Sequence, residues 1–197
     1  MNKDREIWEN FKDGDQSALS NIYFQYFQSM FQYGIRFKDD SEFIKDCIQD
    51  VFFKLIQAGD KLSPTDNIRF YLFKALKNAI YKEIDKGKKI ELVEFASLKF
   101  DSPFAFEQEL AEKEKVSNRE IALLKALNEL SARQREIIYL RYECGLEYEQ
   151  ICEIMQLKND SARKLVFRAI KSLKEIIEGQ FHLPILIFIR FSNKHAL

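Results

Sequence analysis

Basic side chains gather in the stretch from Lys158 to Lys174, which holds six lysines or arginines and a single acidic residue, Asp160. Helical spacing places Ala162 and Val166 on one side of this stretch and the basic residues on the other. An α-helix fits the major groove of duplex DNA, where arginine and lysine donate hydrogen bonds to guanine edges and to phosphates. A charged run can equally be the solvated face of an ordinary amphipathic helix. The residues expected to face outward are Arg163, Lys164, Phe167, Arg168, Lys171 and Lys174.

Two shorter helices are expected before this basic helix. Ser131 and Gln134 have the spacing of a capping box, which opens the first helix, and Gly145 can take the left-handed conformation that ends it. A second helix with an apolar face follows, and Asn159 or Asp160 can then cap the third helix. Two short helices, a tight turn and a longer helix with a basic outer face form the helix-turn-helix plan of DNA-binding domains.

The first two of these helices contain the pattern L-x-x-x-Q-R-E-x-x-x-L-R-Y, followed by G-x-x-Y-x-x-I-x-x-x-(L/M). The matching residues are Leu130, Gln134, Arg135, Glu136, Leu140, Arg141, Tyr142, Gly145, Tyr148, Ile151 and Met155. This pattern resembles the promoter-reading domain of RNA polymerase sigma factors of the extracytoplasmic-function group. The resemblance implies that the third helix reads the minus-thirty-five element, but Leu165 stands where many members have arginine, so their base-reading code is not transferred. The implied DNA-contacting residues are Lys158, Ser161, Arg163, Lys164, Phe167, Arg168 and Lys171.

A second candidate site lies on the helix expected from Ser41 to Gly59. Its apolar residues recur at helical spacing, and the opposite side carries acidic, amide and aromatic side chains. On periodicity alone this is an ordinary surface. The segment D-x-x-Q-D-V-F, from Asp46 to Phe52, resembles the sigma-factor segment that binds the clamp helices of the polymerase's largest subunit, where carboxylates can pair with arginines. The polymerase-binding residues that the resemblance implies are Asp46, Gln49, Asp50 and Phe53.

Aromatic and basic residues alternate on the expected outer side of the next helix, over residues 67–89. Single-stranded DNA exposes its bases, and stacking on aromatic rings contributes about 1–3 kcal/mol per base while lysines follow the phosphates. The alternative is that the rings pack against neighbouring helices. The resemblance implies that this helix and the loop from Asp60 to Asn67 melt the minus-ten element and hold an extruded base. Tyr71, Lys82 and Asp85 depart from the residues usual in the family. The residues predicted to contact the melted strand are Phe70, Lys74, Lys77, Asn78 and Tyr81.

Composition excludes several classes of protein. The 197 residues carry 31 basic and 31 acidic side chains, so the net charge is zero and a partner must supply part of any affinity for DNA. Cys47, Cys144 and Cys152 lack metal-ligand spacing and fit small thiols in a reducing cytoplasm. No basic-then-apolar signal segment opens the chain, so secretion is not expected. The apolar stretch at 181–191 is shorter than the roughly 20 residues that span a bilayer, so stable membrane insertion is not expected.

The sequence predicts an all-α protein of two small helical domains joined by a flexible linker, the second domain being a helix-turn-helix. The expected parts are an N-terminal domain at 1–88, a linker at 89–118, the helix-turn-helix domain at 119–178 and an apolar tail at 179–197. The predicted function is a cytoplasmic transcription initiation factor that brings core RNA polymerase to promoter DNA, as duplex and as melted strand. Catalysis, cofactors and metal ions are not expected, and an anti-sigma factor is a further candidate partner.

Two other functions fit parts of the sequence. A stand-alone transcriptional regulator with the same helix-turn-helix would bind duplex DNA without polymerase, and a gel-shift with duplex alone would reveal it. A helical adaptor that binds only protein would carry its basic helix incidentally. Reversing the charge of Arg163 and Lys164 would then leave the adaptor's activity intact.

Overall fold

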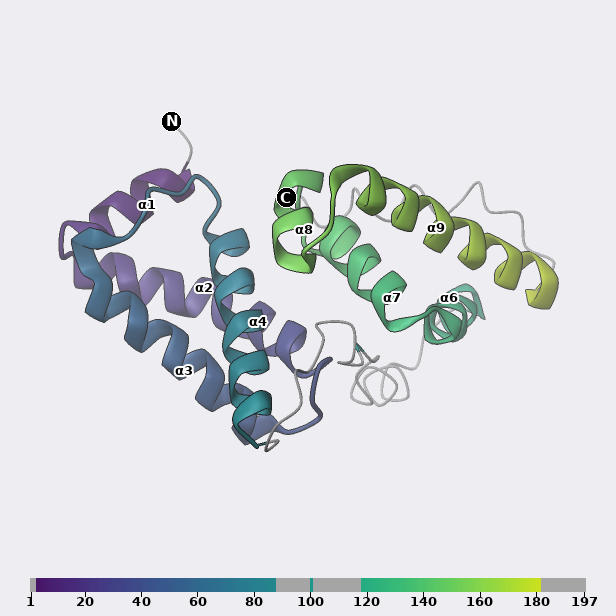
Figure 1. Ribbon diagram of the computed structural model, residues 1–197, viewed down its shortest axis with the longest axis horizontal. Helices are drawn as coiled ribbons and strands as arrows, with labels where there is room; N and C mark the ends of the chain where they lie inside the picture. The colour runs from purple at the N-terminus through teal and green to yellow at the C-terminus, as the bar shows by residue number, and fades with distance from the viewer. Residues whose placement is uncertain (1–2, 88–99, 101–117, 182–197) are drawn as a thin grey trace. The chain divides into compact units, whose positions relative to one another are not determined.

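The computed structural model describes residues 3–87, 100 and 118–181, and these residues form helices and their connections, without any β-strand (Figure 1). The predicted all-α class is therefore confirmed. The chain divides into two compact units, Met1–Leu98 and Lys99–Leu197. Most of the predicted linker and residues 182–197 of the predicted tail lie outside the described residues, so their boundaries and roles stay predictions.

In its described part, the first unit consists of four α-helices and one 3-10 turn (Figure 1, purple to teal). The last of these helices, α4, contacts each of the other three, α1, α2 and α3. The elements are α1 (Lys3–Lys12), α2 (Gln16–Gly34), α3 (Ser41–Ala58), η1 (Gly59–Lys61) and α4 (Ile68–Gly87).

Aromatic side chains fill the core of this unit. Tyr33 of α2 stacks on Phe73 of α4 with ring centroids 4.8 Å apart, and both side chains are fully buried. Gly34 lets α2 and α3 approach closely, because a Cβ at this position would lie 2.7 Å from the Cγ2 atom of Ile44. Cys47 is buried in the same core, and burial raises the pKa of its thiol to about 11. A thiol held in this way remains protonated at neutral pH and acts as a small apolar side chain.

Helix α1 holds the loop that leads into α4. The indole Nε1 of Trp8 donates a hydrogen bond of 3.0 Å to the carbonyl of Ser63 in that loop. The carboxylate of Asp4 accepts a hydrogen bond of 2.9 Å from the amide of Ile68, the first residue of α4. Asn67 caps the same end of α4 through its side-chain oxygen. The start of α4 is therefore fixed both by its own cap and by a helix far away in the sequence.

The second unit contains the predicted helix-turn-helix, which is confirmed. The predicted capping box is present, because the Ser131 hydroxyl accepts from the Gln134 amide at 3.4 Å and the Gln134 side chain accepts from the Ser131 amide at 3.0 Å. Gly145 adopts a positive φ of 68° as expected. The described elements are α6 (Asn118–Glu129), α7 (Ala132–Ile138), η2 (Tyr139–Glu143), α8 (Tyr148–Met155) and α9 (Asn159–Phe181).

Two details of this unit differ from the prediction. The last turn of the first motif helix is a π-helix, η2, in which the amide of Cys144 bonds to the carbonyl of Tyr139 five residues earlier. The predicted cap of α9 by Asn159 or Asp160 is wrong, because the helix already begins at Asn159 and the carbonyl of Lys158 accepts its first hydrogen bond. The side chain of Asn159 is used for contacts to other side chains.

Candidate nucleic-acid interface

One face of α9 is buried and the other is open. Ala162, Val166 and Ala169 are buried where α9 packs on α6, α7 and α8. On the opposite side, Phe167 keeps 69% of its surface accessible, although a phenylalanine on this helix could have packed inward. The structure thus leaves this face available to a partner, and its contact with DNA stays a prediction. The exposed residues are Lys158, Ser161, Arg163, Lys164, Phe167, Arg168 and Lys171, which are all the residues predicted for the upstream element.

Positive charge on this face is concentrated in the first half of α9. In the second half, each lysine faces a glutamate one turn later, at 3.7 Å in Lys171–Glu175 and at 3.8 Å in Lys174–Glu178. Exposed pairs of this kind add little stability, but they offset the charge that a phosphate would meet. The basic residues of the first half form no ion pair within the described part of the chain. The face that could meet DNA is therefore the N-terminal half of the helix.

Arg163 is anchored on this face by two neighbouring side chains. Its guanidinium carbon lies 4.6 Å from the ring centroid of Tyr148, at the start of α8. Its Nε donates a hydrogen bond of 2.8 Å to the side-chain oxygen of Asn159. Arg168, one turn and a half later, has only a 3.3 Å hydrogen bond from its Nε to the carbonyl of Lys164 among the described contacts. The two arginines thus differ in how firmly they are held.

The five residues of α4 that were predicted to contact a melted strand differ in how exposed they are. Asn78 is exposed, and Phe70 and Lys74 are partly buried. Lys77 and Tyr81 are only 4% and 5% exposed. The prediction that both lie on an open outer face is therefore wrong.

Phe37, in the connection that follows α2, accounts for part of this burial. The ring of Tyr81 packs edge-on to Phe37 with centroids 6.3 Å apart. The ammonium group of Lys77 lies 5.6 Å from the ring centroid of Phe37 and 5.8 Å from that of Tyr81. Cation–π attraction of this kind offsets part of the cost of removing the ammonium group from water. The side of α4 that the sequence pattern predicted to be exposed is thus partly buried against Phe37.

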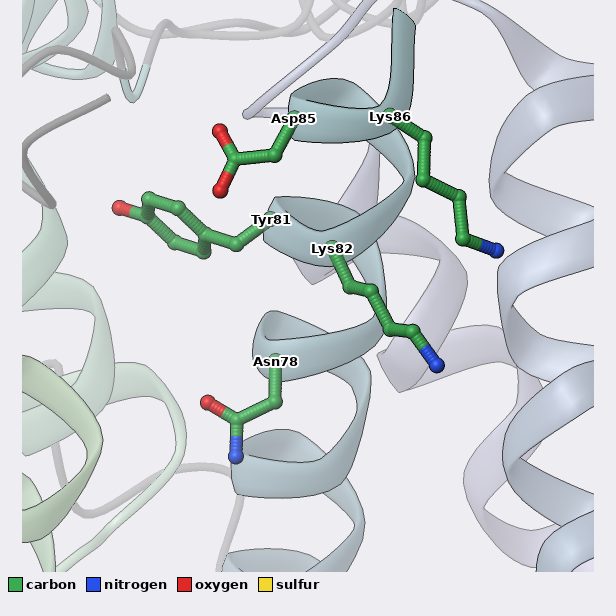
Figure 2. A pocket seen from close by; sticks show the side chains of 5 residues that line it. All are labelled: Asn78, Tyr81, Lys82, Asp85 and Lys86. Atoms are coloured by element: carbon green, nitrogen blue, oxygen red, sulfur yellow. The ribbon is translucent and has the colours of Figure 1, made fainter. Parts of the chain in front are cut away.

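A pocket runs along the second half of α4 and is shown in Figure 2. The side chains of Asn78, Tyr81 and Asp85 leave one side of the helix, and those of Lys82 and Lys86 leave the other. The pKa of Asp50 on α3 is lowered mainly by the hydrogen bond from Lys54, and the positive charges of Lys82 and Lys86 lower it further. Sequence reasoning did not assign Lys82 and Lys86 to the site. Their spacing of four residues from each other and from Asn78 is the signal that could have done so.

A second pocket of about 330 Å³ lies between α3, α4 and Leu62, the residue that follows η1. Leu62 belongs to the loop that was predicted to hold an extruded base, so the structure has a hollow at one end of that loop. Its lining is mainly apolar, with a few polar groups that could orient a ligand. The lining residues are Val51, Lys54, Leu55, Ala58, Leu62, Tyr71, Ala75, Asn78, Ala79 and Lys82.

On α3, the residues predicted to bind polymerase lie at the surface. Asp46 and Gln49 are exposed and Phe53 is 55% exposed, whereas Asp50 is half-buried. Asp50 accepts a hydrogen bond of 2.7 Å from the ammonium group of Lys54, one turn later. This hydrogen bond is the main reason why the pKa of Asp50 lies below its ordinary value. The four side chains share one helix but only three are open, so Asp50 would have to exchange its intrahelical partner to bind another protein.

Exposed aromatic surface continues from α3 onto α2, where sequence reasoning did not look for it. Phe24 is 80% exposed, and Tyr23 beside it packs on Phe52 of α3 with ring centroids 5.1 Å apart. Ile56, one turn after Phe52, is also exposed. Consecutive aromatic residues in one helix cannot both face the core, and this is the signal that could have identified Phe24. We call Tyr23, Phe24, Phe53 and Ile56 the α2–α3 apolar patch.

Comparison with known families identifies the chain. The model of Sigma-70 region 2 matches residues 22–90, and the model of Sigma-70, region 4 matches residues 120–173. Together the two matches cover more than half of the 197 residues. The chain belongs to the sigma-70 family. The predicted resemblance to sigma factors of the extracytoplasmic-function group is confirmed, and a sigma factor of this family directs RNA polymerase to promoters.

Solved structures share the fold of this sigma factor. The structure of CnrH in complex with the cytosolic domain of CnrY has a TM-score of 0.59 and 19% identity, over 90% of this chain and 98% of that one. The sigma factor RpoE from Bartonella quintana, in complex with the anti-sigma factor NepR, has a TM-score of 0.54 and 23% identity, over 82% and 97% of the two chains. A search among curated proteins gave no match.

Each of the two family matches covers one of the two helical units. Region 2 covers α2 from residue 22 onward, α3 and α4, which carry the α2–α3 apolar patch and both pockets. Region 4 covers the helix-turn-helix up to residue 173. Helix α1 precedes the region 2 match, although Trp8 and Asp4 in it hold the start of α4. Within the described ranges, no cluster of side chains could bind a metal ion and no helix is long and apolar enough to cross a membrane.

Proposed function

We propose that this sigma factor assigns three tasks to three surfaces. The N-terminal half of α9 reads the upstream promoter element, α4 with the pocket behind it captures the melted strand, and α3 with the α2–α3 apolar patch docks on core polymerase. The observation that carries the proposal is the open basic face of α9, on which all seven predicted residues are exposed. Polymerase performs the catalysis in the cytoplasm, and the chain itself supplies recognition.

Charge and shape support the reading of the upstream element by α9. The apolar side of α9 is used for packing, so its basic side is free to enter a major groove. Arginine and lysine in the first two turns can donate to guanine edges and phosphates, while Phe167 offers apolar contact to a thymine methyl group. Because the whole chain has no net charge, this helix alone gives weak binding, and polymerase supplies the remaining affinity.

The accessible part of α4 supports strand capture. Phe70, Lys74 and Asn78 can meet a single strand from solvent, with the pocket of about 330 Å³ next to Asn78 as the place for an extruded base. We assign Lys77 and Tyr81 a supporting task, because both pack against Phe37. They hold the helix surface on which the strand lies.

Acidic and aromatic side chains together support polymerase docking. Asp46 can pair with an arginine of a partner helix and fix its register. Exposed aromatic residues such as Phe24 and Phe53 are the residue type that dominates protein interfaces once they are buried. RpoE was solved with the anti-sigma factor NepR, and CnrH with the cytosolic domain of CnrY. An anti-sigma protein is therefore included among the proposed partners.

The test is in-vitro transcription of a promoter library by purified core polymerase, with and without this chain. We expect transcripts from a small set of promoters that share an upstream and a downstream element, and only when the chain is present. A gel-shift with duplex from the same promoters, at moderate salt and without polymerase, should show weak binding. Tight duplex binding without polymerase, together with no effect on transcription, would instead support a stand-alone regulator.

A further inference from the structure

The guanidinium group of Arg163 is held on two of its sides. Its carbon lies over the ring of Tyr148, 4.6 Å from the ring centroid, and its Nε donates a hydrogen bond of 2.8 Å to the side-chain oxygen of Asn159. The terminal nitrogens have no acceptor among the described residues. Four N–H donors therefore remain at the outer end of the side chain, in the planar arrangement that matches two acceptors side by side.

The two side chains that hold Arg163 are themselves fixed. A second guanidinium group, that of Arg141, lies 4.9 Å from the ring of Tyr148 and forms an ion pair of 2.9 Å with Glu147. The side-chain amide of Asn159 donates a hydrogen bond of 3.2 Å to Glu149. Contacts therefore run from the start of α8 across the turn to the first residues of α9. This network sets the direction of Arg163 without using its terminal nitrogens.

A fixed direction matters because an arginine side chain has many rotamers. Ordering them at the moment of binding lowers affinity, and a side chain that is ordered beforehand avoids this cost. Guanine presents O6 and N7 in the major groove as two adjacent acceptors, which is the pair that terminal guanidinium nitrogens match. Arg168, with no aromatic ring against it among the described contacts, lacks this arrangement. It is better suited to a phosphate, which tolerates many directions of approach.

We propose that Tyr148 and Asn159 are positioning residues that preset Arg163 to read a guanine at one base pair of the upstream element. The inference rests on the proposed function, in which α9 enters the major groove. Beyond that function, Arg163 is the residue of α9 that selects a base, and guanine is the base selected. Tyr148 and Asn159 strengthen this selection without contacting DNA.

The test uses the full chain with core RNA polymerase and a library in which every base pair of the upstream element is varied, with sequencing of the transcripts as readout. The intact chain should prefer guanine about ten-fold at one position, the size expected for one bidentate arginine contact. Arg163→Ala should abolish the preference at that position and leave other positions unchanged. Tyr148→Leu should lower it about three-fold or more, whereas Tyr148→Phe, which keeps the ring face, should retain it.

Asn159→Ala is a second, independent variant at an exposed position, and it should also weaken the same preference. Tyr142→Leu is the matched control, because Tyr142 is 46% exposed in the same motif and no arginine stacks on its ring within the described part. It should leave every base preference unchanged. Thermal melting of each variant reports whether the domain is folded.

Two outcomes overturn the inference while the proposed function stands. One is that Arg163→Ala lowers transcription equally from all sequences, which would make Arg163 a phosphate contact. The other is that Tyr148→Leu and Asn159→Ala, both folded, keep the full guanine preference or lose activity without regard to sequence. If the intact chain shows no base preference anywhere in the upstream element, the proposed function itself fails.

Discussion

Helices α4 and α9 look alike in sequence but differ in how much of their basic and aromatic surface is open. Both combine an apolar stripe with lysines and aromatic residues at helical spacing. The basic face of α9 is exposed in the structure, whereas Lys77 and Tyr81 of α4 are buried. Both helices contact three others, but Phe37 covers a further side of α4, whereas α9 leaves its basic side open. A helical pattern therefore predicts which residues share a face, but not how many faces are covered.

The largest expected effect comes from one substitution made on both helices. Phe73 of α4 is fully buried and stacked on Tyr33, so Phe73→Ala should lower the free energy of unfolding by about 3–5 kcal/mol. Phe167→Ala on the exposed face of α9 should change it by no more than about 0.5 kcal/mol. Urea denaturation measures both values. Similar losses at the two positions would contradict the contrast between the helices.

Charge reversal on α9 should give the next largest effect. Lys164→Glu combined with Arg168→Glu replaces two donors with two groups that repel phosphate. Transcription from the best promoter should fall by about 100-fold, as expected for the loss of two contacts of roughly 1–3 kcal/mol each. Co-purification with core polymerase should be unchanged, because these residues belong to the other unit from α3. An equal loss of polymerase binding would argue against separate surfaces.

Removing two rings of the α2–α3 apolar patch should weaken core polymerase binding. Phe24→Ala with Phe53→Ala is expected to raise the dissociation constant about ten-fold or more, since buried aromatic anchors each contribute more than about 1 kcal/mol to an interface. Ile170→Ala, at an exposed position on α9, is the matched control and should leave the constant unchanged. Unchanged binding of the double variant would remove this patch from the interface.

The smallest effect is expected on the open part of α4. Asn78→Ala should reduce permanganate reactivity of the melted strand by about three-fold, because one polar contact contributes roughly 0.5–1.5 kcal/mol. The melting temperature should not change, since Asn78 is exposed. Gln32→Ala, at another exposed helical position, controls for a general effect of the substitution. A wild-type footprint would exclude Asn78 from strand capture.

Sequence reasoning predicted the helix-turn-helix well because its signals are local. The capping box of Ser131 and Gln134, the positive φ of Gly145 and the apolar spacing of α9 all depend on neighbours within a few residues. The burial of Lys77 depends on Phe37, which lies forty positions away, and no local pattern reports such a contact. The exposed Phe24 was missed as well, because none of the motifs that indicated the predicted sites includes it.

Helix α1 ends before the part of the chain that the family models match, yet Trp8 and Asp4 hold the loop and the first turn of α4. A protein shortened to the matched part would therefore lose the brace of α4 while keeping every residue that we propose to contact DNA. Substitutions in α1 would then change the efficiency of promoter opening without altering which promoters are chosen. Changes in α1 would thus let related sigma factors differ in the amount of transcript they produce while recognising the same promoters.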